Sequence, residues 1–154
     1  MAKEIKNSLN GSGLKIAIAV ARFNEVVTDK LLEGALRQLE LLGVDDKDVT
    51  VVRVPGAFEL PGVCRRLADS KKYSAVMAIG AVIRGETSHY DVVVNASTGG
   101  VASIAAEGKL PVILGILTTD TVDQAMNRAG LKASNLGANW ASTAVEMANL
   151  YKVI

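Results

Sequence analysis

Four apolar runs recur along the chain, and each is continuous and rich in β-branched residues. They span residues 14–21, 49–54, 75–83 and 112–117. A strand with one face in water alternates between apolar and polar residues, whereas a strand buried on both faces reads as an unbroken apolar run. The pattern therefore predicts four strands that are buried on both faces.

The first two segments between these runs have helical spacing. After the first strand, one helix face is formed by Leu32, Ala35, Leu36, Leu39 and Leu42. We expect Thr28 or Asp29 to cap the start of this helix and Gly43 to end it. After the second strand, Pro61 predicts a helix over about 60–70, because proline is tolerated in the first turn of a helix.

A third helix is predicted after the third strand, over about 87–107. Its inward side is expected to carry Val94, Ser97, Val101 and Ile104. Gly99 and Gly100 lie within it, and each costs about 1 kcal/mol relative to alanine in a helix interior. We expect these glycines to allow a neighbouring backbone to approach closely.

Two helices are predicted after the fourth strand. Thr121 and Gln124 form a capping box that begins a short helix, and Gly130 ends it. The side chains of this helix that are expected to face inward are Val122, Ala125, Met126 and Ala129. The final helix covers about 138–152, with its core face formed by Trp140, Ala144, Met147 and Tyr151.

The alternation of strands and helices predicts a parallel sheet, because parallel strands are joined by crossover helices. We expect a small doubly wound, flavodoxin-like α/β fold in three layers, with about four strands and helices on both faces of the sheet. Residues 1–13 are expected to form a polar N-terminal segment, and residues 14–154 a single domain. Ligands of such folds bind outside the carboxyl ends of the strands.

Composition narrows the function classes. The chain has 154 residues, near the size of one ordinary domain, and a net charge of +1. That balance disfavours a nucleic-acid or membrane partner but leaves room for a local anion site. Apolar residues make up 49% of the chain and mean hydropathy is +0.27. We therefore expect part of the apolar surface to be buried against another copy of the chain.

The single cysteine, Cys64, can form neither an internal disulfide nor a zinc cluster. We interpret it as a small buried side chain in a reducing compartment. Residues 1–13 lack the apolar segment of a signal peptide, and no run of about 18 apolar residues occurs. These features predict a cytoplasmic protein, or in a plant a protein of the plastid stroma.

The candidate site consists of the residues that follow the four strands. These are 22–24, 55–59, 84–89 and 118–120. Phe23 and Phe58 are the only phenylalanines of the chain, and both lie in these loops. Each ring either offers a planar apolar face to a ligand or fills the end of the sheet.

Four polar features could bind or convert a ligand. The turn at 85–88 precedes a helix, so its free N–H groups would either hold a phosphate or serve as ordinary capping. His89 would lie beside such a phosphate and could exchange protons near neutral pH, or be an ordinary surface histidine. Arg128 could contact an anion or be solvated. Glu59 could bind polyol hydroxyls or cap a helix. No nucleotide-binding glycine motif is present.

Five separated segments together resemble the lumazine synthase (6,7-dimethyl-8-ribityllumazine synthase) family. They are ARFN at 21–24, VPGAFELP at 54–61, IGAVIRGETSHY at 79–90, GILTT at 115–119 and QAMNRAG at 124–130. The resemblance runs from about residue 14 to the C-terminus. It implies a transferase of riboflavin biosynthesis that condenses 5-amino-6-(D-ribitylamino)uracil with 3,4-dihydroxy-2-butanone 4-phosphate. The products are 6,7-dimethyl-8-ribityllumazine, phosphate and water, and the family uses neither a metal nor an organic cofactor.

The resemblance also implies roles for individual residues. His89 is the expected proton-transfer group, and Phe23 is expected to stack on the pyrimidine. The residues expected around the pyrimidine and its ribityl chain are Phe23, Ala57, Phe58, Glu59, Ala81, Val82, Ile83 and Leu114. Those expected to hold the phosphate are Glu86, Thr87, Arg128 and Lys132.

Two positions depart from the family pattern. The family often has an aromatic residue near Leu114, contributed by a neighbouring subunit, and a lysine where Leu136 stands. Leu114 would give contact without stacking. Because Leu136 replaces the lysine, added cationic attraction for the phosphate would have to come from Lys132. These departures affect the expected affinity more than the reaction type.

The resemblance implies assembly as well as activity. The expected partner is a homopentamer, alone, paired as a decamer or closed into an icosahedral capsid of sixty subunits, with riboflavin synthase as an associated enzyme. Two other classes stay open: a flavodoxin-like module that binds a flavin or pterin-like ligand without turnover, and a shell subunit that has kept only the fold.

Overall fold

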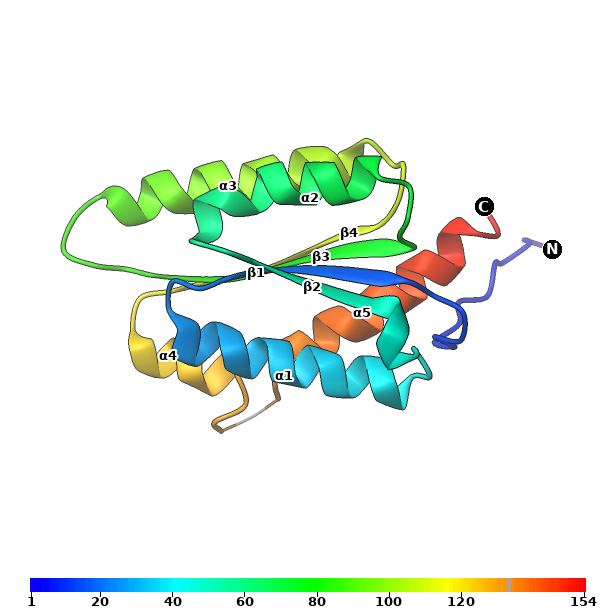
Figure 1. The fold of residues 1–154 in the computed structure, drawn as a ribbon, viewed down its shortest axis with the longest axis horizontal. Helices are drawn as coiled ribbons and strands as arrows, with labels where there is room; N and C mark the ends of the chain where they lie inside the picture. Colours follow the sequence, from blue (N-terminus) through cyan, green and yellow to red (C-terminus); the bar gives the residue numbers. More distant parts are fainter. Residues whose placement is uncertain (133) are drawn as a thin grey trace.

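The sheet has four parallel strands in the order β2-β1-β3-β4 (Figure 1). The computed structural model describes residues 1–132 and 134–154. The strands are β1 (Ile16–Ala21), β2 (Val49–Val54), β3 (Ala75–Ile83) and β4 (Val112–Thr119). This confirms that four strands form, with β1 starting two residues later and β4 ending two residues later than expected. The expectation that all four are buried on both faces was wrong for the edge strands: only Val54 is buried in β2, and β4 has two exposed residues.

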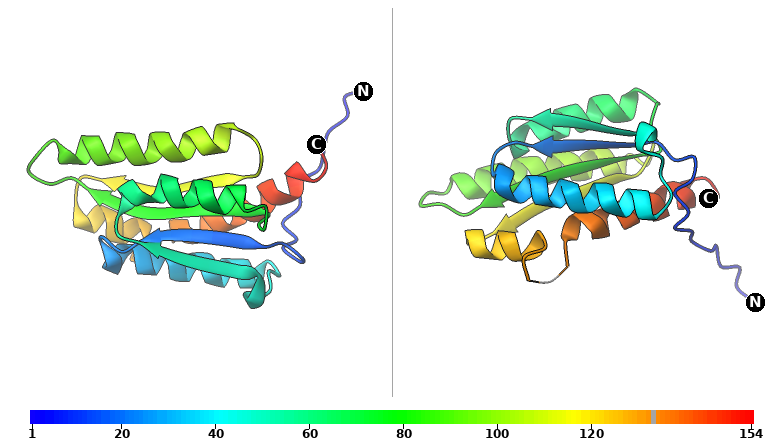
Figure 2. Two further views of the ribbon diagram at one scale, coloured as in Figure 1. Left: turned by 45° about the horizontal axis from the view of Figure 1, so that its top comes forward. Right: turned by 60° about the horizontal axis from the view of Figure 1, so that its bottom comes forward.

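Helices cover both faces of the sheet, which confirms the predicted three-layer α/β fold (Figure 1). The helices on one face are α2 (Leu60–Asp69) and α3 (His89–Ala106). Those on the other face are α1 (Glu25–Leu41), α4 (Val122–Arg128) and α5 (Leu136–Tyr151). Single turns of 3₁₀ helix, η1 (Asp46–Asp48) and η2 (Ala57–Glu59), flank β2. Figure 2 shows α1 beside α5 and the N-terminal segment extending away from the domain.

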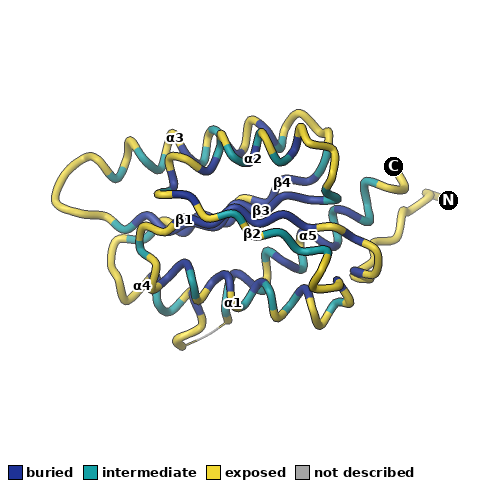
Figure 3. The backbone as a smooth tube through the Cα atoms, viewed as in Figure 1, coloured by how far each residue is buried: buried dark blue, intermediate teal, exposed yellow. Residues whose placement is uncertain are grey.

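Two apolar clusters form the core, one on each face of the sheet. Every residue of β1 is buried, and so is all of β3 except its last residue (Figure 3). On β1, Ile16, Ile18 and Val20 face α1 and α5, whereas Ala17 and Ala19 face α2 and α3. Because successive side chains of a strand point to opposite faces, the small residues let α2 and α3 approach the sheet closely.

Two glycines allow tight helix packing. A Cβ added at Gly100 would lie 2.7 Å from the ring of Pro61, so α2 and α3 approach closely there, as expected. Gly99 faces open space, so the expectation for that glycine was wrong. A Cβ added at Gly137 would overlap the carbonyl oxygen of Leu31, which makes Gly137 the point where α5 approaches α1.

The start of α1 differs from the prediction. The helix begins at Glu25, and its N-cap is Asn24. Neither of the two predicted capping residues occupies the N-cap position. Thr28 is buried inside the helix, and its hydroxyl donates a hydrogen bond to the carbonyl oxygen of Ala21, 2.8 Å away. The end of α1 agrees with the prediction, since Gly43 follows the helix with a φ of 93°.

The faces of α4 and α5 also differ in part. The capping box at Thr121 is confirmed, but Val122 is 58% exposed and does not face inward. On α5 the buried residues are Gly137, Ala141, Ala144, Val145 and Ala148. Of the four expected there, only Ala144 is buried; Trp140, Met147 and Tyr151 are half-buried. Close packing of α5 on α1 selects small side chains, which moves the larger ones to the margin.

The N-terminal segment lacks helix and strand and is exposed up to Asn10. Asn149 on α5 donates two hydrogen bonds of 2.9 Å to it, one to the carbonyl oxygen of Ser8 and one to that of Asn10. In the described parts of the chain, no helix is both long and apolar enough to cross a bilayer.

Candidate active site

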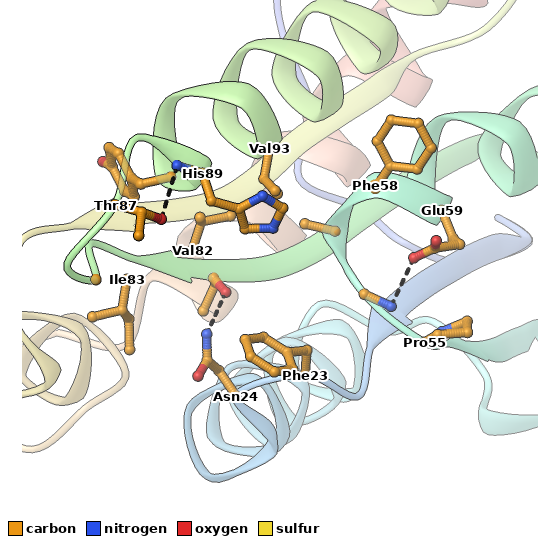
Figure 4. A pocket seen from close by; sticks show the side chains of 15 residues that line it. Phe23, Asn24, Pro55, Phe58, Glu59, Val82, Ile83, Thr87, His89 and Val93 are labelled. Atoms are coloured by element: carbon orange, nitrogen blue, oxygen red, sulfur yellow. Dashed lines mark hydrogen bonds between the residues drawn. The ribbon is translucent and has the colours of Figure 1, made fainter.

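A cleft of about 480 Å³ lies at the carboxyl ends of β1, β2 and β3 (Figure 4). This is the edge of the sheet where a doubly wound fold is expected to bind ligands. Its lining residues come from the end of β3, from three post-strand loops and from the first two turns of α3. They are Phe23, Asn24, Pro55, Gly56, Ala57, Phe58, Glu59, Ala81, Val82, Ile83, Gly85, Thr87, His89, Tyr90 and Val93.

Backbone hydrogen bonds hold the loops after β1 and β2 together. The N–H of Arg22 donates to the carbonyl oxygen of Val54 at 2.8 Å, and that of Phe23 to the carbonyl oxygen of Pro55 at 3.0 Å. The pairing of the two strands therefore continues past their ends. Phe23 lies at the last of these bonds, where its ring can form a wall of the cleft (Figure 4).

Both phenylalanine rings are exposed. Phe23 is 72% and Phe58 62% accessible to solvent, and both line the cleft. A ring that filled the end of the sheet would be buried among its apolar residues. The structure therefore excludes that interpretation and leaves two aromatic faces available to a ligand.

Glu59 caps a helical turn, which is one of the two roles predicted for it. Its Oε2 accepts a hydrogen bond of 3.0 Å from the N–H of Gly56, which caps the turn that carries Ala57 and Phe58. The bond orients the carboxylate at the cleft wall (Figure 4). The second carboxylate oxygen is left for a hydroxyl donor of a ligand.

The loop between β3 and α3 brings backbone and side-chain polar groups to the cleft. His89 is the first residue of α3, two residues after the predicted helix start. Its backbone N–H donates to the hydroxyl oxygen of Thr87 at 3.3 Å. Figure 4 shows the imidazole pointing into the cleft below Val93. The remaining free N–H groups of this helix start favour an anion.

Arg84 lies in the same loop, but its charge is already paired. Its Nε is 2.9 Å from Oδ1 of Asp120, and its guanidinium lies 4.2 Å from the ring centre of Tyr90. The hydrogen bond from Arg84 to Asp120 raises the pKa of the guanidinium above its usual value. These contacts connect the end of β3 to the end of β4 and to the first turn of α3. Arg84 therefore stabilises the loop and does not line the cleft.

Four residues predicted for the site lie outside the cleft of this chain. They are Glu86, Leu114, Arg128 and Lys132. Leu114 is 43% exposed in the middle of β4, and Arg128 and Lys132 are exposed near the C-terminal end of α4. No lysine or arginine occurs among the described lining residues. One chain thus brings together Thr87 and the residues predicted around the pyrimidine and its ribityl chain, except Leu114, but no cation for the phosphate.

The cleft also contains residues to which the sequence assigned no individual role. Asn24, Pro55, Gly56 and Gly85 lie in the post-strand segments predicted for the site, which confirms those segments. Tyr90 and Val93 were not predicted for the site; Tyr90 directly follows His89, and this proximity could have indicated it. Val93 follows His89 by four positions, so helical spacing alone places both on one face of α3.

The part of the chain that the structure describes contains no cluster of three or more metal-ligating side chains. Cys64 is buried in α2, and desolvation raises the pKa of its thiol to about 12. A thiol with so high a pKa stays protonated and unreactive at neutral pH.

Fold and cleft together define a doubly wound α/β domain with an aromatic-walled small-molecule site that carries a carboxylate and an imidazole. Comparison with known families makes the assignment specific. Residues 13–152 match the family 6,7-dimethyl-8-ribityllumazine synthase. The chain is 51% identical over 150 residues to the 6,7-dimethyl-8-ribityllumazine synthase of Desulfotalea psychrophila, covering 97% of both chains. The chain therefore belongs to the 6,7-dimethyl-8-ribityllumazine synthase family, which confirms the resemblance inferred from the five segments.

Proposed function

We propose that this protein is a transferase of riboflavin biosynthesis. It condenses 5-amino-6-(D-ribitylamino)uracil with 3,4-dihydroxy-2-butanone 4-phosphate to form 6,7-dimethyl-8-ribityllumazine, with release of phosphate and water. The observation that carries the proposal is the cleft, which combines two exposed aromatic rings, an oriented carboxylate and an imidazole in a member of this family.

The apolar and aromatic wall of the cleft suits the pyrimidine. The ring of Phe23 offers a face for stacking, and Ala81, Val82 and Ile83 line the cleft from the end of β3. Ala57, Phe58 and Glu59 line the part of the cleft assigned to the ribityl chain. A carboxylate accepts hydrogen bonds from hydroxyl groups, and Glu59 is held in place by Gly56.

His89 is the proposed acid and base. The amine of the pyrimidine attacks the ketone of the butanone, and loss of water gives an imine. Elimination of phosphate and ring closure then need further proton transfers, which an imidazole can mediate near neutral pH. Positioning of the two substrates supplies much of the remaining acceleration, because holding them together replaces a bimolecular encounter.

The phosphate site is proposed to be completed by a second subunit. Thr87 and the start of α3 offer hydrogen-bond donors, yet the described lining of the cleft has no cationic side chain. Arg128 and Lys132 are exposed and form no ion pair with a described residue. A neighbouring chain that presents these two residues, with Leu114, would supply the missing charge. We assign Glu86 to the same phosphate region.

The proposed assembly is a homopentamer with one site at each contact between neighbours. Leu114 is 43% exposed on the edge strand β4, which is consistent with burial against another chain. We further propose that the pentamer can pair as a decamer or close into an icosahedral capsid, and that it can associate with riboflavin synthase. We also propose the cytoplasmic location that was expected from the sequence.

A substrate assay coupled to sizing tests the proposal. The two substrates are mixed with the protein, and the lumazine chromophore is followed while light scattering measures the mass of the active species. We expect turnover well above the spontaneous condensation in an oligomer. A rate equal to the spontaneous one contradicts the enzyme function. Ligand binding without turnover would instead support a binding module, and an active monomer would refute the shared site.

A further inference from the structure

Asn24 has an unusual backbone conformation for a residue with a side chain. Its φ is 63° and its ψ is 44°, which is the left-handed helical region. Among the described residues other than glycine, only Lys71 shares a positive φ. Asparagine tolerates this region better than most residues, but it still costs free energy unless the surroundings hold it.

Three hydrogen bonds hold Asn24 in this conformation. Its Nδ2 donates to the carbonyl oxygen of Ala81 at 2.8 Å, across the ends of β1 and β3 (Figure 4). Its own carbonyl oxygen accepts from the N–H groups of Val27 at 2.9 Å and Thr28 at 3.0 Å, which starts α1. Asn24 therefore connects the first helix to the strand that forms the floor of the cleft.

Phe23 depends on this arrangement. Its ring is 72% exposed, so packing in the core does not determine where the ring lies. Its backbone is held by the carbonyl oxygen of Pro55 on one side and by Asn24 on the other. These two attachments fix the backbone that carries the ring relative to the ends of β2 and β3.

We propose that Asn24 is a positioning residue for the pyrimidine site. Its left-handed backbone and its amide hold the ring of Phe23 opposite the end of β3, so that a planar ring can enter between them. Asn24 acts on the affinity for the pyrimidine and leaves the phosphate-bearing substrate unaffected. This inference rests on the proposed function, because it names the substrate that each part of the cleft takes.

Three variants separate the side-chain bond from the backbone conformation. Asn24→Asp keeps the size of the side chain but turns an oxygen toward the carbonyl oxygen of Ala81. Asn24→Gly removes the bond and keeps easy access to a positive φ. Asn24→Ala removes the bond and adds the cost of the left-handed backbone. We expect the loss of pyrimidine affinity to be smallest for Asn24→Gly.

The measurement is steady-state kinetics with each substrate varied in turn, together with calorimetric titration of the pyrimidine alone. For Asn24→Asp we expect the Kd and KM of the pyrimidine to rise about 10-fold, the effect of one lost hydrogen bond of ordinary strength. The KM of the butanone phosphate should change less than about twofold, within the scatter of distant substitutions. Lys71→Gly is the control. Lys71 also has a positive φ but lies before the start of β3, away from the cleft, so this variant should leave both KM values unchanged.

Each outcome decides the question. An unchanged pyrimidine Kd in Asn24→Asp overturns the inference, and so do equal rises in both KM values, which a general loss of structure would cause. If Asn24→Asp fails to fold, Asn24→Gly carries the same comparison. A wild-type protein without turnover overturns the proposed function and this inference with it, whereas wild-type turnover with unaltered variants overturns the inference alone.

Discussion

Replacing Arg128 by alanine tests the charge balance of the proposed phosphate site. The cleft of one chain has Glu59 and His89 but no lysine or arginine among its described lining residues. An arginine from a neighbour would therefore be a main source of positive charge for a doubly charged phosphate. A hydrogen bond to a charged group contributes about 1.5–3 kcal/mol. At about 1.4 kcal/mol for each factor of ten, its loss raises KM about 10- to 100-fold.

The assay follows the lumazine chromophore while each substrate is varied separately. We expect Arg128→Ala to raise the KM of the butanone phosphate and leave that of the pyrimidine within about twofold, because distant sites act independently. Arg128→Lys should give a KM of the butanone phosphate between those of the wild type and Arg128→Ala, since lysine keeps the charge but loses the planar guanidinium. Arg66→Ala is a matched control, because Arg66 is also exposed in the last turn of a short helix. Equal increases for both substrates would refute the assignment of Arg128 to the phosphate.

Three further predictions concern catalysis, packing and reactivity. His89→Ala should lower kcat about 100-fold, at the low end for general acid–base catalysis, because positioning and spontaneous condensation remain; an unchanged kcat in the chromophore assay would exclude His89 from the chemistry. Gly137→Ala should destabilise the fold by about 1–3 kcal/mol in thermal unfolding, because its Cβ overlaps the carbonyl oxygen of Leu31. Gly62→Ala, where a Cβ meets open space, is its control and should stabilise. Cys64 should resist a thiol reagent at pH 8, since burial raises its pKa to about 12; labelling as fast as in urea would contradict this.

The central strands β1 and β3 were predictable because burial on both faces leaves an unbroken apolar run in the sequence. The edge strand β2 has a similar run although only its last residue is buried. The bounds of β2 and β3 agree with the predicted runs. Helix faces were less certain where two helices pack on each other as well as on the sheet. On α5 the contact with α1 favours Gly137 and Ala141, and large residues such as Trp140 lie beside the contact. Size, and not hydrophobicity alone, decides which residues are buried there.

The candidate site was predictable where it depends on one chain. Parallel strands bring the loops after β1, β2 and β3 to one edge, so Phe23, Glu59 and His89 meet although they are far apart in sequence. The proposed role of Asn24 could not be predicted from the sequence, because a residue with a positive φ leaves no periodic pattern of apolar and polar residues. Arg128 lies outside the cleft, because its proposed contact needs a second copy of the chain.

Mixed oligomers of two variants test the central claim of a catalytic site shared between neighbouring subunits. Chains with His89→Ala lack the proton-transfer group of the cleft, and chains with Arg128→Ala lack the cation offered to the neighbour. The two are co-expressed with different tags, purified as hybrids and assayed at low butanone phosphate.

If each site takes its cleft from one chain and its arginine from the next, half of the clefts and half of the arginines are intact. Random association then leaves about one quarter of the sites complete, so a hybrid should reach about 25% of wild-type activity. If each chain supplied its own whole site, no mixture would contain a complete one. Hybrid activity no higher than the mean of the two parents would contradict the shared site.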